Sequence, residues 1–167
     1  MPRFTVHYSF SQKFPFPAGE VYAWSTDYRP EDIDLSGREG KREIERIDDS
    51  TLILTDTVKQ AGVSRTKVRL IRLFPDILTW TNTRLSEEGR HSQFIYKIVP
   101  DGPGSSRLDF SGAQLDESPK APSSSQLSAL ARRYSEADER IWVNLAAALE
   151  KDLGPRRSRG TSGSRER

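Results

Sequence analysis

The stretch that decides the fold is Ser124–Leu153, with the sequence SSQLSALARRYSEADERIWVNLAAALEKDL. Its apolar residues recur at spacings of three and four, which is the period of one face of a helix. These residues are Leu127, Leu130, Tyr134, Ala137, Ile141, Leu145 and Ala148, with Trp142 and Leu149 widening the stripe. We therefore predict one long amphipathic helix whose apolar face covers another apolar surface.

The ends of this helix are also marked in the sequence. Serines at Ser123–Ser125 are candidate N-caps, and Gly154–Pro155 predicts that the helix ends there. The predicted inner stripe holds no histidine, cysteine or carboxylate. We therefore expect the helix to serve as a lid and a wall, with any chemistry coming from the surface that it covers.

The chain before this helix reads mainly as strands. Phe4–Ser11 alternates apolar and polar side chains, which is the period of a half-buried strand. Five turn signals then divide Lys41–Leu115 into six more strands. The signals are Asp48–Ser50, Gln60–Gly62, Pro75–Asp76, Glu87–Gly89 and Asp101–Gly104. Short connections favour antiparallel neighbours, so we predict an α+β fold with a curved seven-stranded antiparallel sheet around the C-terminal helix.

Two short helical segments are expected between the first and second strands. Pro17 suits the first turn of a helix because its missing N–H would be unpaired there, and Val21, Trp24 and Tyr28 then share one face. A second short helix or turn is expected within Arg29–Leu35, followed by a loop at Ser36–Gly40.

Composition limits the class of protein. A chain of 167 residues with 34% apolar and 30% charged residues fits a single domain, which we place at residues 1–153. The chain contains no cysteine, which excludes disulfides and Cys-ligated metal sites. No segment approaches the roughly 20 apolar residues of a membrane span, so we expect no membrane insertion and a cytoplasmic protein.

The basic character of the chain is concentrated at its end. Residues 154–167 hold five arginines and one glutamate, a net charge of +4, whereas the whole chain carries +2. The preceding residues are therefore at −2, and the pI of about 9.0 comes largely from a tail that we predict to be disordered. The tail has no aromatic residue for base stacking, so we expect no specific nucleic-acid binding and at most a weak, salt-dependent contact with an anionic surface.

Metal and cofactor sites are not predicted. His7 and His91 are the only histidines, and each alternates with apolar residues expected to face inward. Both should therefore point away from the interior, and neither has the partners of a metal site or a nucleophile triad. We predict no metal and no cofactor, and the sequence leaves open whether the protein is a monomer or a homodimer.

Three motifs together resemble the START/polyketide-cyclase-like superfamily, also called SRPBCC, over Phe4–Leu153. The first is a P-A-x-x-V-(Y/W) helix at Pro17–Tyr22, and the second is the turn after an apolar strand at Ile98–Gly104. The third is the W-x-x-L-x-x-x-L-E pattern at Trp142–Glu150. The resemblance implies a helix-grip fold, with a sheet that grips the C-terminal helix around a cavity for lipids, polyketides or aromatic molecules.

The resemblance leaves three functions open, because members of the superfamily bind, cyclise or dehydrate small molecules or act as chaperone co-activators. We favour binding of a hydrophobic or amphiphilic small molecule without catalysis. The first alternative is a cyclase/dehydratase-like lyase or isomerase that uses polar cavity residues. The second alternative is a protein–protein adaptor with a filled cavity.

Polar interruptions of the predicted wall are the candidate catalytic residues. Alternation places Val68, Leu70 and Phe74 inward, and Arg72 shares their face, while Asp56 shares a face with inward leucines. A turn centred near Val63–Ser64 would set Asp56 opposite Arg72, as either a structural salt bridge or a functional pair. By analogy with the superfamily we place Trp80 inward, which brings Asn82 to the wall. The catalytic candidates are Asp56, Arg72 and Asn82.

The predicted ligand-binding set combines these residues with the apolar and aromatic wall. Its members are Tyr8, Phe10, Leu54, Asp56, Leu70, Arg72, Trp80, Asn82, Phe94, Tyr96, Phe110, Leu130 and Tyr134. Apolar members would supply affinity, and polar members would orient the ligand.

Overall fold

The computed structural model describes residues 1–35, 37, 39–86 and 89–160. Parts of three predicted segments lie outside these residues. They are positions 36 and 38 of the predicted loop, positions 87 and 88 of one turn, and positions 161–167 of the predicted tail.

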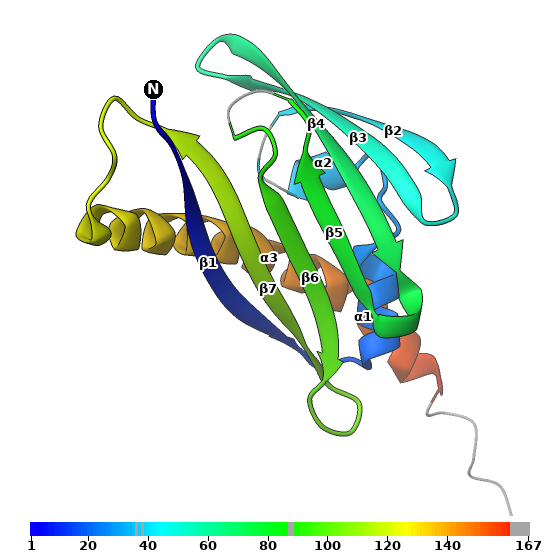
Figure 1. Ribbon diagram of the computed structural model, residues 1–167. Coiled ribbons are helices and arrows are strands. Elements are labelled where there is room, and N and C mark those ends of the chain that lie inside the picture. The colour runs from blue at the N-terminus through cyan, green and yellow to red at the C-terminus, as the bar shows by residue number, and fades with distance from the viewer. Residues whose placement is uncertain (36, 38, 87–88, 161–167) are drawn as a thin grey trace, which may run out of the picture.

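Seven strands form one antiparallel sheet, with two short helices after the first strand and one long helix at the end (Figure 1). The elements are β1 (Arg3–Phe14), α1 (Ala18–Ser25), α2 (Asp32–Leu35), β2 (Gly40–Asp48), β3 (Thr51–Gln60), β4 (Val63–Phe74), a 3-10 turn (Pro75–Ile77), β5 (Thr79–Arg84), β6 (Gln93–Pro100), β7 (Ser106–Glu117) and α3 (Ser124–Gly160). The strand order is β1-β7-β6-β5-β4-β3-β2. The predicted fold class is confirmed.

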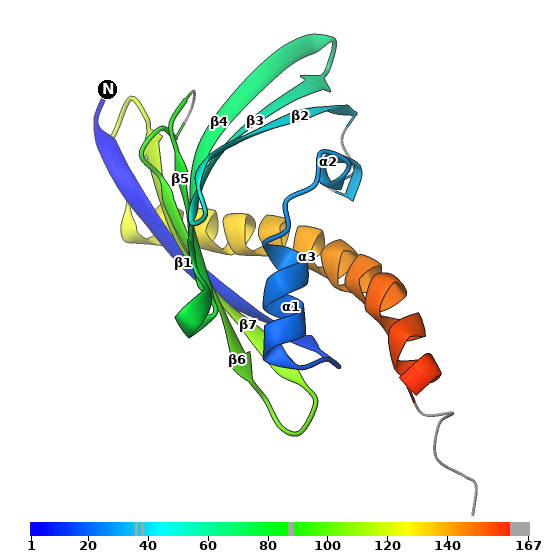
Figure 2. The ribbon, with the colours of Figure 1, turned by 90° about the vertical axis from the view of Figure 1, so that its right-hand side faces the viewer.

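The sheet is strongly curved, and α3 runs across its hollow side (Figure 2). α1 lies beside α3 on the same side, and α2 lies near the end of the sheet formed by β2. Apolar side chains that alternate along the strands meet these helices. Phe14, Leu108 and Leu149 are buried there at 2% exposure or less, so the packed core lies between the concave face and the helices.

The start of α3 agrees with its sequence, and its end does not. The Ser123 hydroxyl accepts a hydrogen bond from the Gln126 N–H at 3.3 Å, and the Gln126 side chain accepts one from the Ser123 N–H at 2.8 Å. This is a capping box. The prediction that the helix ends at Gly154–Pro155 is wrong, because α3 continues through Gly160. Gly154 is not among the glycines with positive φ, so the left-handed turn that would end the helix does not form at this residue.

The register of β3 and β4 also differs from the prediction. The two strands are joined by a two-residue turn, Ala61-Gly62, in which φ is positive at both residues (50° and 77°), as in a type I′ hairpin. Asp56 is therefore opposite Lys67, and Arg72 is opposite Thr51. Placing the turn near Val63–Ser64 was wrong.

The inward face of β4 is consequently the other one. Ile71 is fully buried in the core, whereas Arg72 is exposed and Phe74 is 37% exposed. The prediction that Val68, Leu70, Arg72 and Phe74 face inward is therefore wrong. β4 carries apolar residues and arginines on both faces, so alternation alone could not choose between them.

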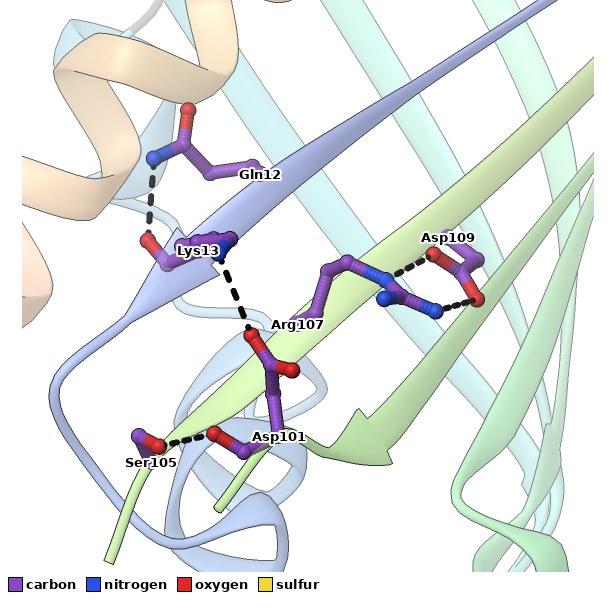
Figure 3. Close-up of polar contacts among 6 residues, drawn as sticks. All are labelled: Gln12, Lys13, Asp101, Ser105, Arg107 and Asp109. Carbon is purple, nitrogen blue, oxygen red and sulfur yellow. Dashed lines mark hydrogen bonds and ion pairs between the residues drawn. The ribbon is translucent and has the colours of Figure 1, made fainter.

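The convex side of β7 carries its own ion pair, which lies away from the core (Figure 3). Arg107 donates to Asp109 through Nε at 2.6 Å and through Nη2 at 3.0 Å. Lys13 of β1 reaches Asp101, in the turn after β6, at 3.6 Å. Because these groups remain substantially exposed, they contribute little to the free energy of folding. None of the helices in the described ranges is long and apolar enough to cross a membrane.

Candidate ligand-binding cavity

A cavity of about 280 Å3 lies between the inner face of the sheet, the α1–α2 segment and α3. Trp24, Tyr28 and Ile33 close it from the α1–α2 side, and Trp142 and Leu145 close it from α3. Small-molecule sites in proteins begin at about 300 Å3. The cavity is slightly below that range, so it has room for a small ligand only.

The inward side chains of two neighbouring strands, β4 and β5, change from apolar to charged in the same direction along the cavity. The inward row of β5 is Trp80, Asn82 and Arg84, which runs from an aromatic residue through an amide to a guanidinium. The facing row of β4 is Leu73, Ile71 and Arg69, and these residues are the register partners of the β5 row in the same order. The wall therefore has an apolar end and a charged end.

The apolar end is built from stacked aromatic rings. Trp80 and Tyr96 are opposite each other on β5 and β6, with ring centroids 4.9 Å apart and planes within 5°. Trp142 of α3 lies 6.2 Å from Trp80 and 5.9 Å from Tyr96. Such rings offer flat apolar surface against which another ring can pack.

At the charged end, Asp56 is held by two arginines. Its carboxylate accepts hydrogen bonds from Arg42 Nε at 2.7 Å and Nη2 at 2.9 Å, and it also accepts one from Arg69 Nη2. Burial alone would raise the pKa of the Asp56 carboxyl, but the Arg42 hydrogen bonds and the two positive charges hold that pKa below its usual value. A carboxylate held in this way is a poor proton acceptor.

Arg84 completes the charged end. It lies directly opposite Arg69 in the β4–β5 register, and its Cζ is 5.6 Å from the ring centroid of Phe94. Burial and, next, the charge of Arg69 lower the pKa of the Arg84 guanidinium. Two guanidinium groups therefore face the same part of the cavity.

Opposite the sheet, α3 contributes a carboxylate. Asp138 lines the cavity and accepts a hydrogen bond from the Tyr8 hydroxyl at 2.6 Å. Burial, followed by the charge of Asp138, raises the pKa of the Tyr8 phenol, so this hydroxyl stays protonated. The prediction that the inner stripe of this helix holds no carboxylate is wrong. Asp138 lies four residues from both Tyr134 and Trp142, and that spacing placed it on the inner face.

Asn82 stands between the two ends of the wall. It is 6% exposed, and its Oδ1 is buried without a hydrogen-bond partner among the described residues. A buried polar atom without a partner is costly. The amide oxygen can therefore accept a hydrogen bond from a ligand.

Comparisons with solved structures agree with this architecture. The chain is 16% identical to the Zhui aromatase/cyclase from Streptomyces sp. R1128, with a TM-score of 0.67 over 96% of this chain and 100% of that chain. It is 16% identical to a START superfamily protein from Mycobacterium smegmatis, with a TM-score of 0.62 over 89% of this chain and 97% of that one. The chain has the helix-grip fold of these proteins.

A third helix-grip structure is norcoclaurine synthase from Thalictrum flavum, solved in complex with dopamine and hydroxybenzaldehyde. It is 14% identical, with a TM-score of 0.64 over 90% of this chain and 87% of that chain. No protein-family model and no curated protein sequence matches the chain. The structural similarity establishes the fold. At identities this low it does not establish the activity, which has to be argued from the site.

Several predicted ligand-binding residues line the helix-grip cavity. They are Tyr8, Asp56, Trp80, Asn82, Phe94 and Tyr96. Phe110 and Tyr134 pack with Tyr8 and Phe94 in a neighbouring aromatic cluster, with Phe10 against it. Leu54 is fully buried in the main core. Leu130 is half-buried on α3 and is not among the described residues that line the cavity. That these residues contact a ligand stays a prediction.

Two predicted site residues lie elsewhere. Leu70 and Arg72 are on the convex side of β4, where the Arg72 guanidinium lies 5.8 Å from the ring centroid of Phe74. The predicted pairing of Asp56 with Arg72 is therefore wrong, and the partners of Asp56 are Arg42 and Arg69.

The sequence reasoning missed most of the charged end, namely Arg42, Lys67, Arg69, Arg84 and Asp138. A signal for two of them was present. Arg84 is two residues from Asn82, which was placed inward, and Arg42 is two residues from the half-buried Ile44. Period-two alternation puts each arginine on the same face as its neighbour.

Proposed function

We propose that the protein binds a small amphiphilic molecule that contains a ring, of the lipid, polyketide or aromatic-metabolite kind, in the cavity between the sheet and α3. The observation that carries this proposal is the two-ended wall. Trp80, Tyr96 and Trp142 offer aromatic surface at one end, and polar groups stand at the other. Sites that bind small molecules combine apolar lining with a few placed polar groups in this way.

The energetics favour binding of a ring at the aromatic end. A ligand that buries about 200 Å2 of apolar surface there gains about 5 kcal/mol from the hydrophobic effect. Asn82 Oδ1 can accept a hydrogen bond from such a ligand and fix its orientation. The cavity speaks against an adaptor with a filled interior.

A second candidate function, a cyclase/dehydratase-like activity, is favoured by the Tyr8–Asp138 hydrogen bond on the cavity wall. A tyrosine paired with a carboxylate can transfer a proton to or from a bound carbonyl compound. Among the original candidates, Asn82 lines the cavity, Asp56 is held by two arginines, and Arg72 is on the convex face. We favour binding because Asn82 and the Tyr8 pair fit ligand orientation equally well.

A fluorescence titration tests the binding proposal. All three tryptophans of the chain, Trp24, Trp80 and Trp142, line the cavity. The neutral probe N-phenyl-1-naphthylamine should bind with micromolar affinity, quench their emission and brighten as it leaves water. Equal brightening with unfolded protein, or no quenching, would contradict the proposal.

A matched pair of variants on α3 locates the binding. Ile141 is half-buried on the cavity wall, whereas Val143 is 57% exposed on the same helix. Ile141→Trp should fill the cavity and weaken probe binding at least tenfold, measured by the emission of the probe itself. Val143→Trp adds the same indole at the surface and should leave the affinity unchanged. Equal affinities in the two variants would place the probe elsewhere.

A further inference from the structure

The charged end of the cavity contains a feature that an apolar ligand does not explain. Arg69 of β4 and Arg84 of β5 are direct register partners on the cavity face. Like charges directly opposite each other destabilise an antiparallel pair of strands. The arrangement is therefore costly unless negative charge is supplied nearby.

The carboxylates in the cavity leave an excess of positive charge. The described lining residues include four cations, Arg42, Lys67, Arg69 and Arg84, and three carboxylates, Asp32, Asp56 and Asp138, which leaves a formal charge of +1. Asp56 forms ion pairs with both Arg42 and Arg69, and Asp138 accepts a hydrogen bond from the Tyr8 hydroxyl. One singly charged anion would balance the charge of these described lining residues.

Arg69 also has an unused donor. One of its nitrogens, Nη2, donates to Asp56, but its Nε is buried and has no hydrogen-bond partner within the described part of the chain. A guanidinium binds carboxylates with high geometric specificity when two of its N–H groups are engaged. Three features therefore occur at the same end of the cavity. They are the unpaired N–H of Arg69, the position of Arg84 opposite Arg69, and the excess of positive charge.

We propose that Arg69 and Arg84 form an anion subsite for a carboxylate on the ligand, with the ring of the ligand directed toward Trp80. This proposal rests on the proposed function and names the ligand class as a ring-bearing monocarboxylate. Trp80 and Arg84 are four residues apart on β5, so at ~3.3 Å per residue the two ends are about 13 Å apart. A phosphate monoester fits less well, because it carries close to two negative charges.

Three ligands that share one ring system test the subsite. They are 2-naphthoate, the uncharged 2-naphthamide and 2-naphthyl phosphate, each measured by displacement of N-phenyl-1-naphthylamine. In the unmodified protein the carboxylate should bind at least tenfold more tightly than the amide, and this ratio should fall with added salt. Tighter binding of the phosphate than of the carboxylate would overturn the assignment of ligand class.

Two arginine variants then locate the subsite. Arg84→Gln should abolish the preference for the carboxylate over the amide, because it removes one of the two guanidinium groups of the subsite. Arg72→Gln removes an arginine from the convex face of β4 and should keep the full preference. If Arg84→Gln does not fold, Arg84→Lys should keep the charge and retain most of the preference.

The outcomes separate the two proposals. Equal affinity for carboxylate and amide in the unmodified protein, with the neutral probe still bound, overturns the anion subsite and leaves the binding function standing. A preference that survives Arg84→Gln also overturns the subsite. Failure of the neutral probe itself to bind overturns the proposed function.

Discussion

The two ends of the concave sheet face are covered by the same helix but are filled in different ways. At one end, Phe14, Leu108 and Leu149 belong to a packed cluster of buried apolar and aromatic side chains. At the other end, Arg69 and Asp56 face a cavity across from Asp138. The packed end follows the rule that a core excludes charge, and the cavity end departs from it. Departures of this kind are expected where a protein binds something.

The largest change in stability is expected when a cavity is made at the packed end. Leu149 is fully buried against the sheet, so Leu149→Ala should lower the free energy of unfolding by about 3 kcal/mol. Val143→Ala, on the exposed side of α3, should change it by less than about 0.5 kcal/mol. Urea denaturation measures both values. A loss below about 1 kcal/mol for Leu149→Ala would mean that this end is not the main source of stability.

The next test removes the carboxylate that balances the charged end. Asp56→Asn leaves Arg42 and Arg69 facing each other without their shared anion, and it should cost about 2 kcal/mol in urea denaturation. Arg72→Gln, on the convex face, should cost little. Equal losses in the two variants would contradict the role given to Asp56.

The same carboxylate predicts a pH dependence. The folded-state pKa of Asp56 is lowered, so its contribution to stability is complete above the unfolded pKa of about 3.9 and is lost as the pH falls through the folded value. The melting temperature of the unmodified protein should therefore drop more steeply below about pH 4 than that of Asp56→Asn. Parallel curves would show that Asp56 carries no such linkage.

The smallest change in stability is expected where β1 meets α3. Tyr8→Phe removes the hydroxyl that donates to Asp138 and should lower the free energy of unfolding by about 1 kcal/mol. The aromatic packing of residue 8 against Phe110, at 5.4 Å between centroids, is kept. A loss as large as that of Leu149→Ala would show that the hydrogen bond does more than join the two elements.

The packed end was largely predictable, because its signals are local. The spacing of Trp142, Leu145 and Leu149 predicts a buried helix face, and turn residues divide the strands at the observed places. Each signal depends on neighbours in sequence and on the period of one element. The fold could be predicted from them together with the superfamily resemblance.

The charged end was mostly not predictable, because it depends on which residues of different strands meet. Asp56 was placed on the correct face, but its partner on β4 follows from the Ala61-Gly62 turn rather than from the pattern of β4. Asp138 was left out of the predicted inner stripe of the helix. Its role becomes visible only when Tyr8, 130 residues away in sequence, is placed beside it.

The turn at Ala61-Gly62 also bears on how the protein could change over generations. β4 has an apolar residue and an arginine on each face, so either face could cover the core. If the two-residue turn is kept, one residue inserted beside it would shift β4 by one position and present Leu70 and Arg72 inward in place of Ile71 and Leu73. A single insertion would thus move a guanidinium along the cavity while the sheet kept its hydrogen bonds. A single insertion in this hairpin would therefore be enough to change the ligand preference of the cavity.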